Sequence, residues 1–226
     1  MVEITKKYKI GTRRFGLVNW YGTWTLYVKE VLRFLNVWAQ TLFSPLISSL
    51  LFLLVLSLAI GTERGEVLGV SFITFLAPGL IAMQIIQQAF SHSSSSLMIK
   101  KIDGTIVDLL FAPLSASEAT IAISLAAVTR SVLLAIISII TFTIIIDIQI
   151  QNYLTLISFT FLSSFILGNI GIIAGLWAEK FDNMATVTNF IIVPLSFLSG
   201  ADLLNPFLFN FLLLASSIIA LRSFDE

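Results

Sequence analysis

Long stretches without charge are the feature that most restricts what this chain can fold into. Segments of about twenty residues with almost no Asp, Glu, Lys or Arg recur along it, and that length crosses the hydrocarbon layer as a helix. Of the 226 residues 57% are hydrophobic and 12% are charged, whereas soluble domains carry about 25% charged residues. A soluble chain with so little charge could not cover its own core, so the sequence predicts an all-α, polytopic integral membrane helical bundle.

Six such segments predict six membrane spans, separated by short polar turns. The spans are expected at about 42–60, 67–90, 123–146, 153–177, 184–199 and 203–221. They form a single predicted transmembrane domain, 20–221, between a basic cytoplasmic tail at 1–19 and a stub at 222–226. In the fourth span, Gly171 and Gly175 have the small-xxx-small spacing that favours close helix contact.

The segment from Trp20 to Gln40 predicts an amphipathic helix that lies in the membrane interface, ahead of the first span. Aromatic and apolar residues recur there every three or four positions, including Trp20, Trp24, Tyr27 and Trp38. The polar residues between them include Lys29, Glu30 and Arg33. Such a helix either anchors the first span or offers a surface to a partner.

The stretch from Lys100 to Glu118 is the longest polar interruption between apolar segments. Apolar residues recur within it at helical spacing, at Ile102, Ile106, Leu109 and Leu110. Pro113 ends this helix, because proline lacks the N–H and disfavours helix in the residue before it. The sequence therefore predicts a short amphipathic helix between two spans, lying either on lipid headgroups or against a soluble partner.

The placement of basic residues predicts that both termini are cytoplasmic. With six spans, eleven Lys and Arg fall on the side of the termini, at Lys6, Lys7, Lys9, Arg13, Arg14, Lys29, Arg33, Lys100, Lys101, Lys180 and Arg222. The opposite side holds Arg64, and Arg130 lies within a span. This orientation puts the Trp20–Gln40 helix and the Lys100–Glu118 stretch on one cytoplasmic face, which favours partner docking for both.

The residues that catalysis or metal binding would need are missing from the sequence. His92, expected in a loop, is the single histidine, and the chain has no cysteine. No GxxxxGK[ST] motif is present to cradle ATP, and the basic N-terminus is better explained by membrane orientation than by nucleic acid. We therefore expect a transport protein rather than an enzyme. The alternative, an ion-coupled secondary transporter or channel, is disfavoured because the predicted spans contain no carboxylate.

Polar side chains within the spans are candidates for the transport path or gate. They are Gln84, Gln87, Gln88, Arg130, Asn189 and Ser196, and Phe197 is added as an apolar plug. The alternative is that the polar groups join helices within one bundle, because polar groups avoid lipid. Arg130 is expected about one turn inside the boundary, in a structural or gating role, paired with Glu118 or Glu179.

Five features in order along residues 20–200 resemble the membrane permease of type-2 ABC exporters. They are WAQTLFSPLI (38–47), FLAPGLIAMQ (75–84), IVDLLFAPLS (106–115), Arg130 and FDNMATVTNFIIVPLSFLSG (181–200). The resemblance implies a homodimeric permease of the cell inner membrane that moves a lipid, drug or glycan-type substrate. ATP and Mg would bind a separate ATP-binding cassette subunit. That subunit would dock on Lys29, Arg33, Ile102, Ile106, Leu109, Leu110 and Phe111.

The sequence departs from the family pattern after Gly200. The family continues there into an external re-entrant segment, whereas this chain runs through Ala-Asp-Leu-Leu-Asn-Pro into its last apolar segment. We therefore expect a shallower outer vestibule, closed by Phe197, Leu198 and Leu203.

Overall fold

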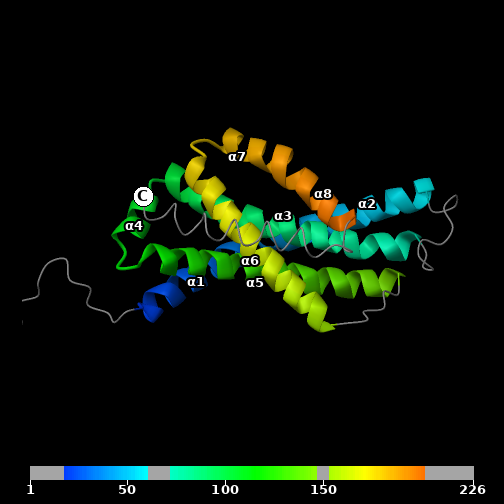
Figure 1. The fold of residues 1–226 in the computed structure, drawn as a ribbon, viewed down its shortest axis with the longest axis horizontal. Helices are drawn as coiled ribbons and strands as arrows, with labels where there is room; N and C mark the ends of the chain where they lie inside the picture. Colours follow the sequence, from blue (N-terminus) through cyan, green and yellow to red (C-terminus); the bar gives the residue numbers. More distant parts are fainter. Residues whose placement is uncertain (1–17, 61–71, 147–152, 202–226) are drawn as a thin grey trace, which may run out of the picture.

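The computed structural model describes residues 18–60, 72–146 and 153–201, and within these ranges the chain is helical apart from short turns. The elements in chain order are α1 (Trp20–Leu35), the π-helix η1 (Ala39–Phe43), α2 (Ser44–Ile60), α3 (Phe72–Ile102), α4 (Ile106–Phe111), α5 (Ala116–Ile146), α6 (Tyr153–Trp177), α7 (Phe181–Val187), the π-helix η2 (Thr188–Ile192) and α8 (Val193–Ala201). Figure 1 shows these helices as an elongated bundle with α3 along its middle.

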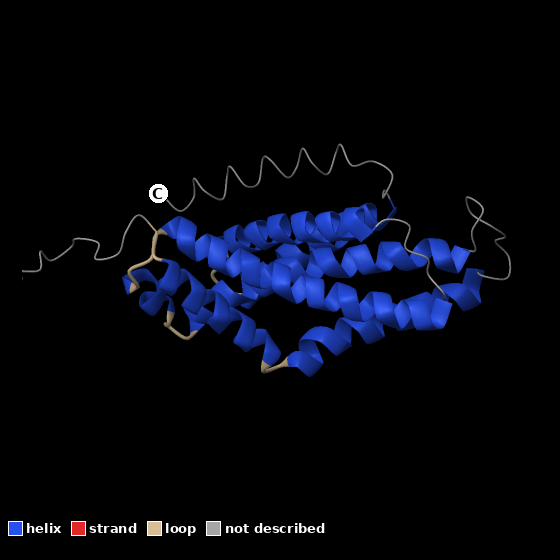
Figure 2. Ribbon diagram, turned by 90° about the horizontal axis from the view of Figure 1, so that it is seen from below, coloured by secondary structure: helices blue, strands red, loops and turns tan. Residues whose placement is uncertain are grey.

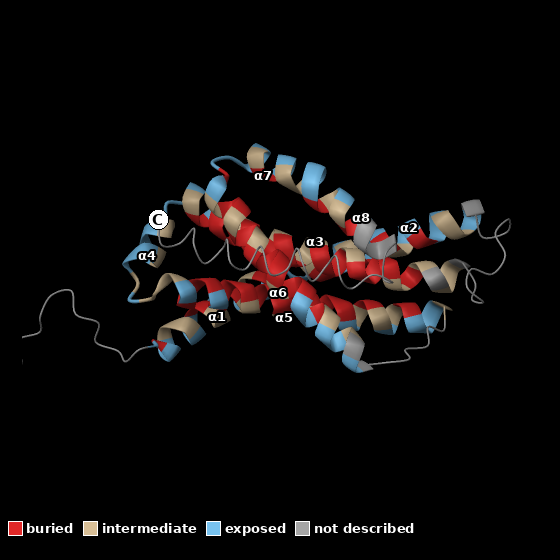
Figure 3. Ribbon diagram, in the orientation of Figure 1, coloured by how far each residue is buried: buried red, intermediate tan, exposed pale blue. Residues whose placement is uncertain are grey.

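Helix α3 is the centre of the bundle because four other helices pack on it. It contacts α2, α5, α6 and α8, and α1 packs along α5. Figure 3 shows the buried residues concentrated where α3, α5 and α6 cross, whereas α4 and α7 are largely exposed. Ile86 and Phe90 of α3 are fully buried in one apolar cluster with residues of α6, α7 and η2. The exposed apolar side chains on α2 and on the later turns of α5 suit contact with lipid.

The contact between α3 and α6 is a close approach of two backbones at glycine. A Cβ placed on Gly171 would lie 2.5 Å from the carbonyl oxygen of Phe90, and one on Gly175 would lie 2.9 Å from that of Ser94. No larger residue fits against main-chain atoms at those distances. The sequence prediction of a close helix contact at Gly171 and Gly175 is therefore confirmed.

The prediction that the serine-rich segment 91–96 lies in a loop is wrong. Helix α3 continues without a break through these residues to Ile102. Three of the five serines face inward at 2% exposure or less, and small side chains let α6 approach there. The helix ends at Ile102, and two residues later Gly104 has a φ of 73°, in the left-handed region that glycine adopts readily. Ile102 therefore belongs to the last turn of α3 and not to the short helix α4.

Three helices in the described part of the chain are long and apolar enough to cross a membrane, over Ala39–Leu58, Ala116–Ile146 and Leu156–Trp177. Helix α5 begins seven residues before the span expected at 123–146, and α7 begins at Phe181 within the loop expected at 178–183. The span expected at 203–221, the tail at 1–17, the stub at 222–226, and Leu203 lie outside the described residues. The six-span arrangement stays a prediction.

Helix α1 does not run straight to Gln40 as the sequence pattern suggested. It ends at Leu35, and a turn at Asn36 and Val37 precedes the π-helix η1, which leads directly into α2. Figure 2 shows α1 and α2 meeting at an angle at this turn, at the lower edge of the view. Because of this turn, α1 packs along α5 whereas α2 packs along α3.

Candidate functional site

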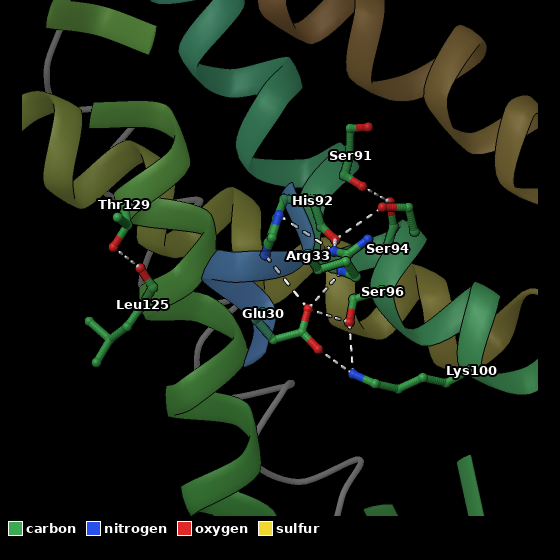
Figure 4. A network of polar contacts seen from close by, with 10 residues as sticks. Glu30, Arg33, Ser91, His92, Ser94, Ser96, Lys100, Leu125 and Thr129 are labelled. Atoms are coloured by element: carbon green, nitrogen blue, oxygen red, sulfur yellow. Dashed lines mark hydrogen bonds and ion pairs between the residues drawn. The ribbon is translucent and has the colours of Figure 1, made fainter. Parts of the chain in front are cut away.

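A buried carboxylate, Glu30 of α1, is the hub of a polar cluster between α1 and α3 (Figure 4). Its side chain is 1% exposed. Its Oε2 accepts hydrogen bonds from Arg33 Nε at 3.0 Å and from Ser96 Oγ at 2.8 Å, and its Oε1 accepts one from Lys100 Nζ. Lys100 also donates to Ser96 Oγ at 2.9 Å. Two positive charges and a hydroxyl thus satisfy one buried negative charge, which is the arrangement that a buried carboxylate requires.

The same cluster joins α1 to the backbone of α3. Arg33 Nη2 donates to the carbonyl oxygen of His92 at 2.9 Å. The His92 ring is fully buried, with Nε2 at 3.8 Å from Glu30 Oε2, and its ring lies edge-on to Phe34. His92 is therefore a packed helix residue, and the prediction of a loop histidine is wrong.

The electrostatics of Glu30 favour its ionised form. Burial raises the pKa of a carboxyl group, but the charges of Lys100 and Arg33, with hydrogen bonds from Lys100 and Ser96, lower the pKa of Glu30 from 4.5 to about 2. Burial lowers the pKa of Lys100, whereas Glu30 acts in the opposite direction. Glu30 is ionised at neutral pH, and its contact with Lys100 ties two helices together.

Sequence reasoning placed Glu30 and Arg33 with the polar side of the first helix, and for Glu30 this is wrong. Leu26, Glu30 and Phe34, spaced by four residues, form the buried face of α1, whereas Trp20 and Trp24 are exposed. The available signal was the spacing of Glu30 from Leu26 and Phe34. The aromatic residues formed a stronger pattern, which suggested that their side of the helix faces lipid headgroups. That pattern drew attention away from the spacing of Glu30.

The start of α1 is held to the start of α5. The backbone N–H of Asn19 donates to Glu118 Oε1 at 2.8 Å, and Asn19 Nδ2 donates to the carbonyl oxygen of Pro113 at 3.1 Å. Glu118 Oε2 also accepts from the backbone N–H of Ser115 at 2.7 Å, so this carboxylate caps its own helix. The loop that follows α4 is therefore fixed to α1 and α5.

Lys101 fixes the other side of α4. Its Nζ donates to the carbonyl oxygen of Ala178 at 2.9 Å and to that of Leu176, at the C-terminus of α6. A cation is favourable at this negative end of a helix dipole. The neighbouring lysines 100 and 101 thus connect the base of α4 to α1 and to α6.

Helix α4 presents three apolar side chains outward, and Val107, at 47%, is the least exposed of them. Leu110 is 76% and Phe111 is 85% exposed. Ile106 is half-buried, and Leu109 packs against the cluster that includes Leu26 of α1. The four α4 residues of the expected docking set are therefore divided, and Leu109 contributes to the core.

The other candidate docking residues also differ in how far they are exposed. Lys29 is exposed on α1, and Ile102 is 54% exposed at the end of α3. Arg33 turns inward to Glu30 and His92, with 30% of its side chain exposed. Arg33 therefore belongs to the polar cluster, and its guanidinium is engaged by Glu30 and His92 and is only partly exposed.

The three glutamines of α3 bond to other helices of the same chain. Gln84 donates to Ser49 of α2 and accepts from Ser138 of α5, while Gln87 donates to Ser196 of α8 at 2.8 Å. Gln88 accepts from Arg130 of α5. Of the two alternatives for these residues, this geometry favours joining helices within one bundle over lining a path. Asn189 and Phe197 of the same candidate set are exposed.

The sequence suggested that Arg130 pairs with Glu118 or Glu179, but Arg130 bonds to neither of them. Its Nη2 donates to Gln88 Oε1, whereas Glu118 accepts from the backbone at Asn19 and Ser115. Arg130 is 8% exposed, and its Nε is buried without a hydrogen-bond partner. Within the described ranges no group of three or more His, Cys, Asp or Glu side chains could hold a metal ion.

Comparison with known proteins finds a matching family and several relatives. The family model described as "ABC-2 type transporter" matches residues 21–203. The "Inner membrane transport permease YadH" of Escherichia coli (strain K12) is 28% identical over 192 residues, which cover 83% of this chain and 75% of the relative. The protein of the same name from Shigella flexneri matches with the same values. No solved structure matches the chain.

Proposed function

This chain belongs to the ABC-2 type transporter family, and we propose that it is the permease of an exporter driven by ATP hydrolysis on a separate subunit. As a permease it is a transport subunit in the inner membrane rather than an enzyme. The proposal adds the export direction, a lipid, drug or glycan-type substrate, and the site at which the ATPase docks. ATP and Mg bind that partner and not this chain.

The observation that carries the docking proposal is the outward apolar pair Leu110 and Phe111. Large apolar side chains at 76% and 85% exposure on a short helix within a polar segment need a partner to remove them from water. Burying one such side chain in a groove is worth roughly 1.5–3 kcal/mol. A two-residue anchor on a rigidly held helix suits recognition by a groove on a protein surface.

Charge supports an orientation with α4 in the cytoplasm, where ATP is available. Lys100 and Lys101 lie in the last turn of α3, which leads into α4, while Lys29 lies on α1 and Lys180 directly precedes α7. Basic residues mark the cytoplasmic side of membrane proteins. Both termini are then cytoplasmic if the chain crosses the membrane six times.

A force on α4 would reach two parts of the bundle. Lys100 connects the preceding helix to α1, and Lys101 connects it to α6. On the other side of α4, Asn19 connects the loop to α1. The docking helix is thus attached to the bundle on both sides, as a coupling element must be.

Transport itself is proposed to occur between two copies of the chain. The polar groups Gln84, Gln87, Gln88 and Ser196 are occupied within one bundle, so they are not available to line the path. Asn189, exposed on η2 beside Phe190 at 79% exposure, is the described polar residue that best suits a face toward a second copy. Phe197 lies near Phe52 with ring centroids 6.4 Å apart and could close such a path as an apolar plug.

The test replaces the apolar anchor while leaving the bundle intact. Phe111→Asp should reduce co-purification of the ATPase by at least about tenfold, because an aspartate in the groove loses the burial energy and adds a desolvated charge. Ser117→Asp is the control, since it places the same charge on an exposed residue of the same end without removing an apolar side chain. Membrane insertion and the thermal unfolding midpoint should match the wild type in both variants. Normal co-purification and coupled transport by Phe111→Asp would contradict the proposal.

A further inference from the structure

The charged layer between α1, α3 and α5 holds more positive than negative charge among the described residues. Arg33, Lys100 and Arg130 are all in it, and in the part of the chain that the structure describes the ion pairs of Arg33 and Lys100 are both with Glu30. Lys100 is 9% and Arg130 is 8% exposed. Buried charges of one sign are unfavourable unless an anion compensates them.

Glu30 cannot compensate Arg130. Its Oε1 accepts from Lys100, and its Oε2 accepts from Arg33 and Ser96. The other carboxylates of the described chain are engaged or face water. Glu118 accepts backbone N–H groups, and the exposed ones are Asp103, Asp108, Glu179 and Asp182. Arg130 is left with the neutral oxygen of Gln88, and its Nε has no partner.

Two guanidinium groups reach neighbouring turns of α3. Arg33 binds at His92 and Arg130 binds at Gln88, which is four residues earlier on the same helix. Residues four apart on a helix lie on one face, so both guanidinium groups bind on the same face of α3. Two positive groups on one face repel, and an anion that contacts both relieves the repulsion.

We propose that Arg33 and Arg130 form a binding site for the phosphate group of a membrane lipid. Guanidinium groups bind phosphate oxygens through paired hydrogen bonds, and Arg130 Nε is a buried donor that lacks such an oxygen. Arg33, with 30% of its side chain exposed, gives the headgroup access from the surface.

The position along α5 is consistent with the headgroup layer. About 20 residues cross the hydrocarbon, so a span that ends at Ile146 begins at about residue 127. Arg130 then lies about one turn inside the boundary, where a long basic side chain reaches the interface. A side chain that reaches the interface from there can meet a phosphate group of the adjacent leaflet, which lies just outside the hydrocarbon. The proposal depends on membrane insertion and not on ATPase docking, so each can fail without the other.

The test measures thermal unfolding of the full chain in detergent as defined lipids are added. Phosphatidylglycerol should raise the unfolding midpoint by at least about 3 °C, whereas diacylglycerol with the same acyl chains should not. Inorganic phosphate, compared with chloride at equal ionic strength, separates the two sources of a phosphate group. Stabilisation by the lipid alone supports the proposal, and equal stabilisation by free phosphate overturns the lipid as its source.

Variants test the residues. Arg130→Gln should lose the response to phosphatidylglycerol, while Lys180→Gln, which removes a positive charge from an exposed residue, should keep it. If Arg130→Gln fails to fold, Arg130→Lys keeps the charge and loses Nε, and its lipid concentration for half-maximal effect should rise at least about fivefold. An unchanged response in the folded Arg130 variant overturns the proposal, as does a wild type that phosphatidylglycerol does not stabilise.

Discussion

The contacts that α3 makes with α6 and with α1 join one helix to two neighbours by opposite means. Against α6 the side chains are reduced to glycine and serine, and backbones meet at Gly171 and Gly175. Against α1 long charged side chains meet around Glu30, and Lys100 and Arg33 bridge the helices. The first contact depends on shape, and the second on charge. The glycine contact leaves no room for a larger side chain. The contact around Glu30 can instead be changed by protonating the carboxylate or by replacing one of its partners.

The largest effect is expected from a substitution in the glycine contact between α3 and α6. Gly171→Leu should abolish the folded protein, because its Cβ would lie 2.5 Å from the Phe90 carbonyl oxygen, which is main chain and cannot move aside. Gly168→Ala is the matched control on the same helix, since its Cβ would meet the side chain of Ala127 at 3.3 Å. Yield of monodisperse protein after detergent extraction measures both. If Gly171→Leu gave wild-type yield, the close approach of α3 and α6 would be wrong.

The next largest effect is expected from a substitution in the charged contact between α1 and α3. Glu30→Gln leaves Lys100 and Arg33 without their carboxylate and should lower the free energy of unfolding by about 3–5 kcal/mol. Glu30→Gln combined with Lys100→Met removes both members of the pair and should recover part of that loss. Denaturant unfolding in detergent measures the difference. A single variant as stable as wild type would show that the cluster does not hold α1 to α3.

Acid should weaken the charged contact in a defined direction. The pKa of Glu30 is lowered from 4.5 to about 2 in the folded chain, so its stabilising effect is present above pH 4.5 and is lost as the pH falls toward 2. The loss is on the order of 3 kcal/mol. The difference in stability between wild type and Glu30→Gln should therefore shrink across this window, as measured by unfolding at stepped pH. A constant difference would contradict the assignment of a depressed pKa to Glu30.

The smallest expected effect concerns Lys101, which bonds the end of α6. Lys101→Met should reduce stability by about 1–2 kcal/mol, the range for a cation at a partly buried helix C-terminus. Lys180→Met, at an exposed position nearby, should change stability by less than about 0.5 kcal/mol. Thermal unfolding distinguishes the two. Equal effects would mean that the carbonyl oxygens of Leu176 and Ala178 do not depend on Lys101.

The two contacts also differ in how far the sequence could predict them. Gly171 and Gly175 could be predicted because glycine at that spacing in an apolar helix has few other uses. Glu30 could not, because a carboxylate among aromatic residues is usually exposed, and its partners lie 66 and 70 residues away, at Ser96 and Lys100. Sequence distance hides a contact that forms only when the folded chain brings these side chains of α1 and α3 together.

The same reason explains other results. The glutamines of α3 were recognised as polar residues in a span, but their partners Ser49, Ser138 and Ser196 depend on which helices pack together. The short helix α4 was predicted correctly in type and in its end before Pro113, because proline acts locally. Which of its apolar residues face outward depended on α1, and so Leu109 was assigned to the wrong side.

The most direct measurement of the central claim is where the ATPase touches this chain. The chain has no cysteine, so Phe111→Cys supplies a single thiol for a photoactivated crosslinker. Leu58→Cys, 74% exposed on α2 at the opposite end of the bundle from α4, is the control. We predict adducts with the ATPase from position 111 and none from position 58. Absence of adducts at 111 in an assembled, active transporter, or equal adducts at both positions, would contradict α4 as the docking helix.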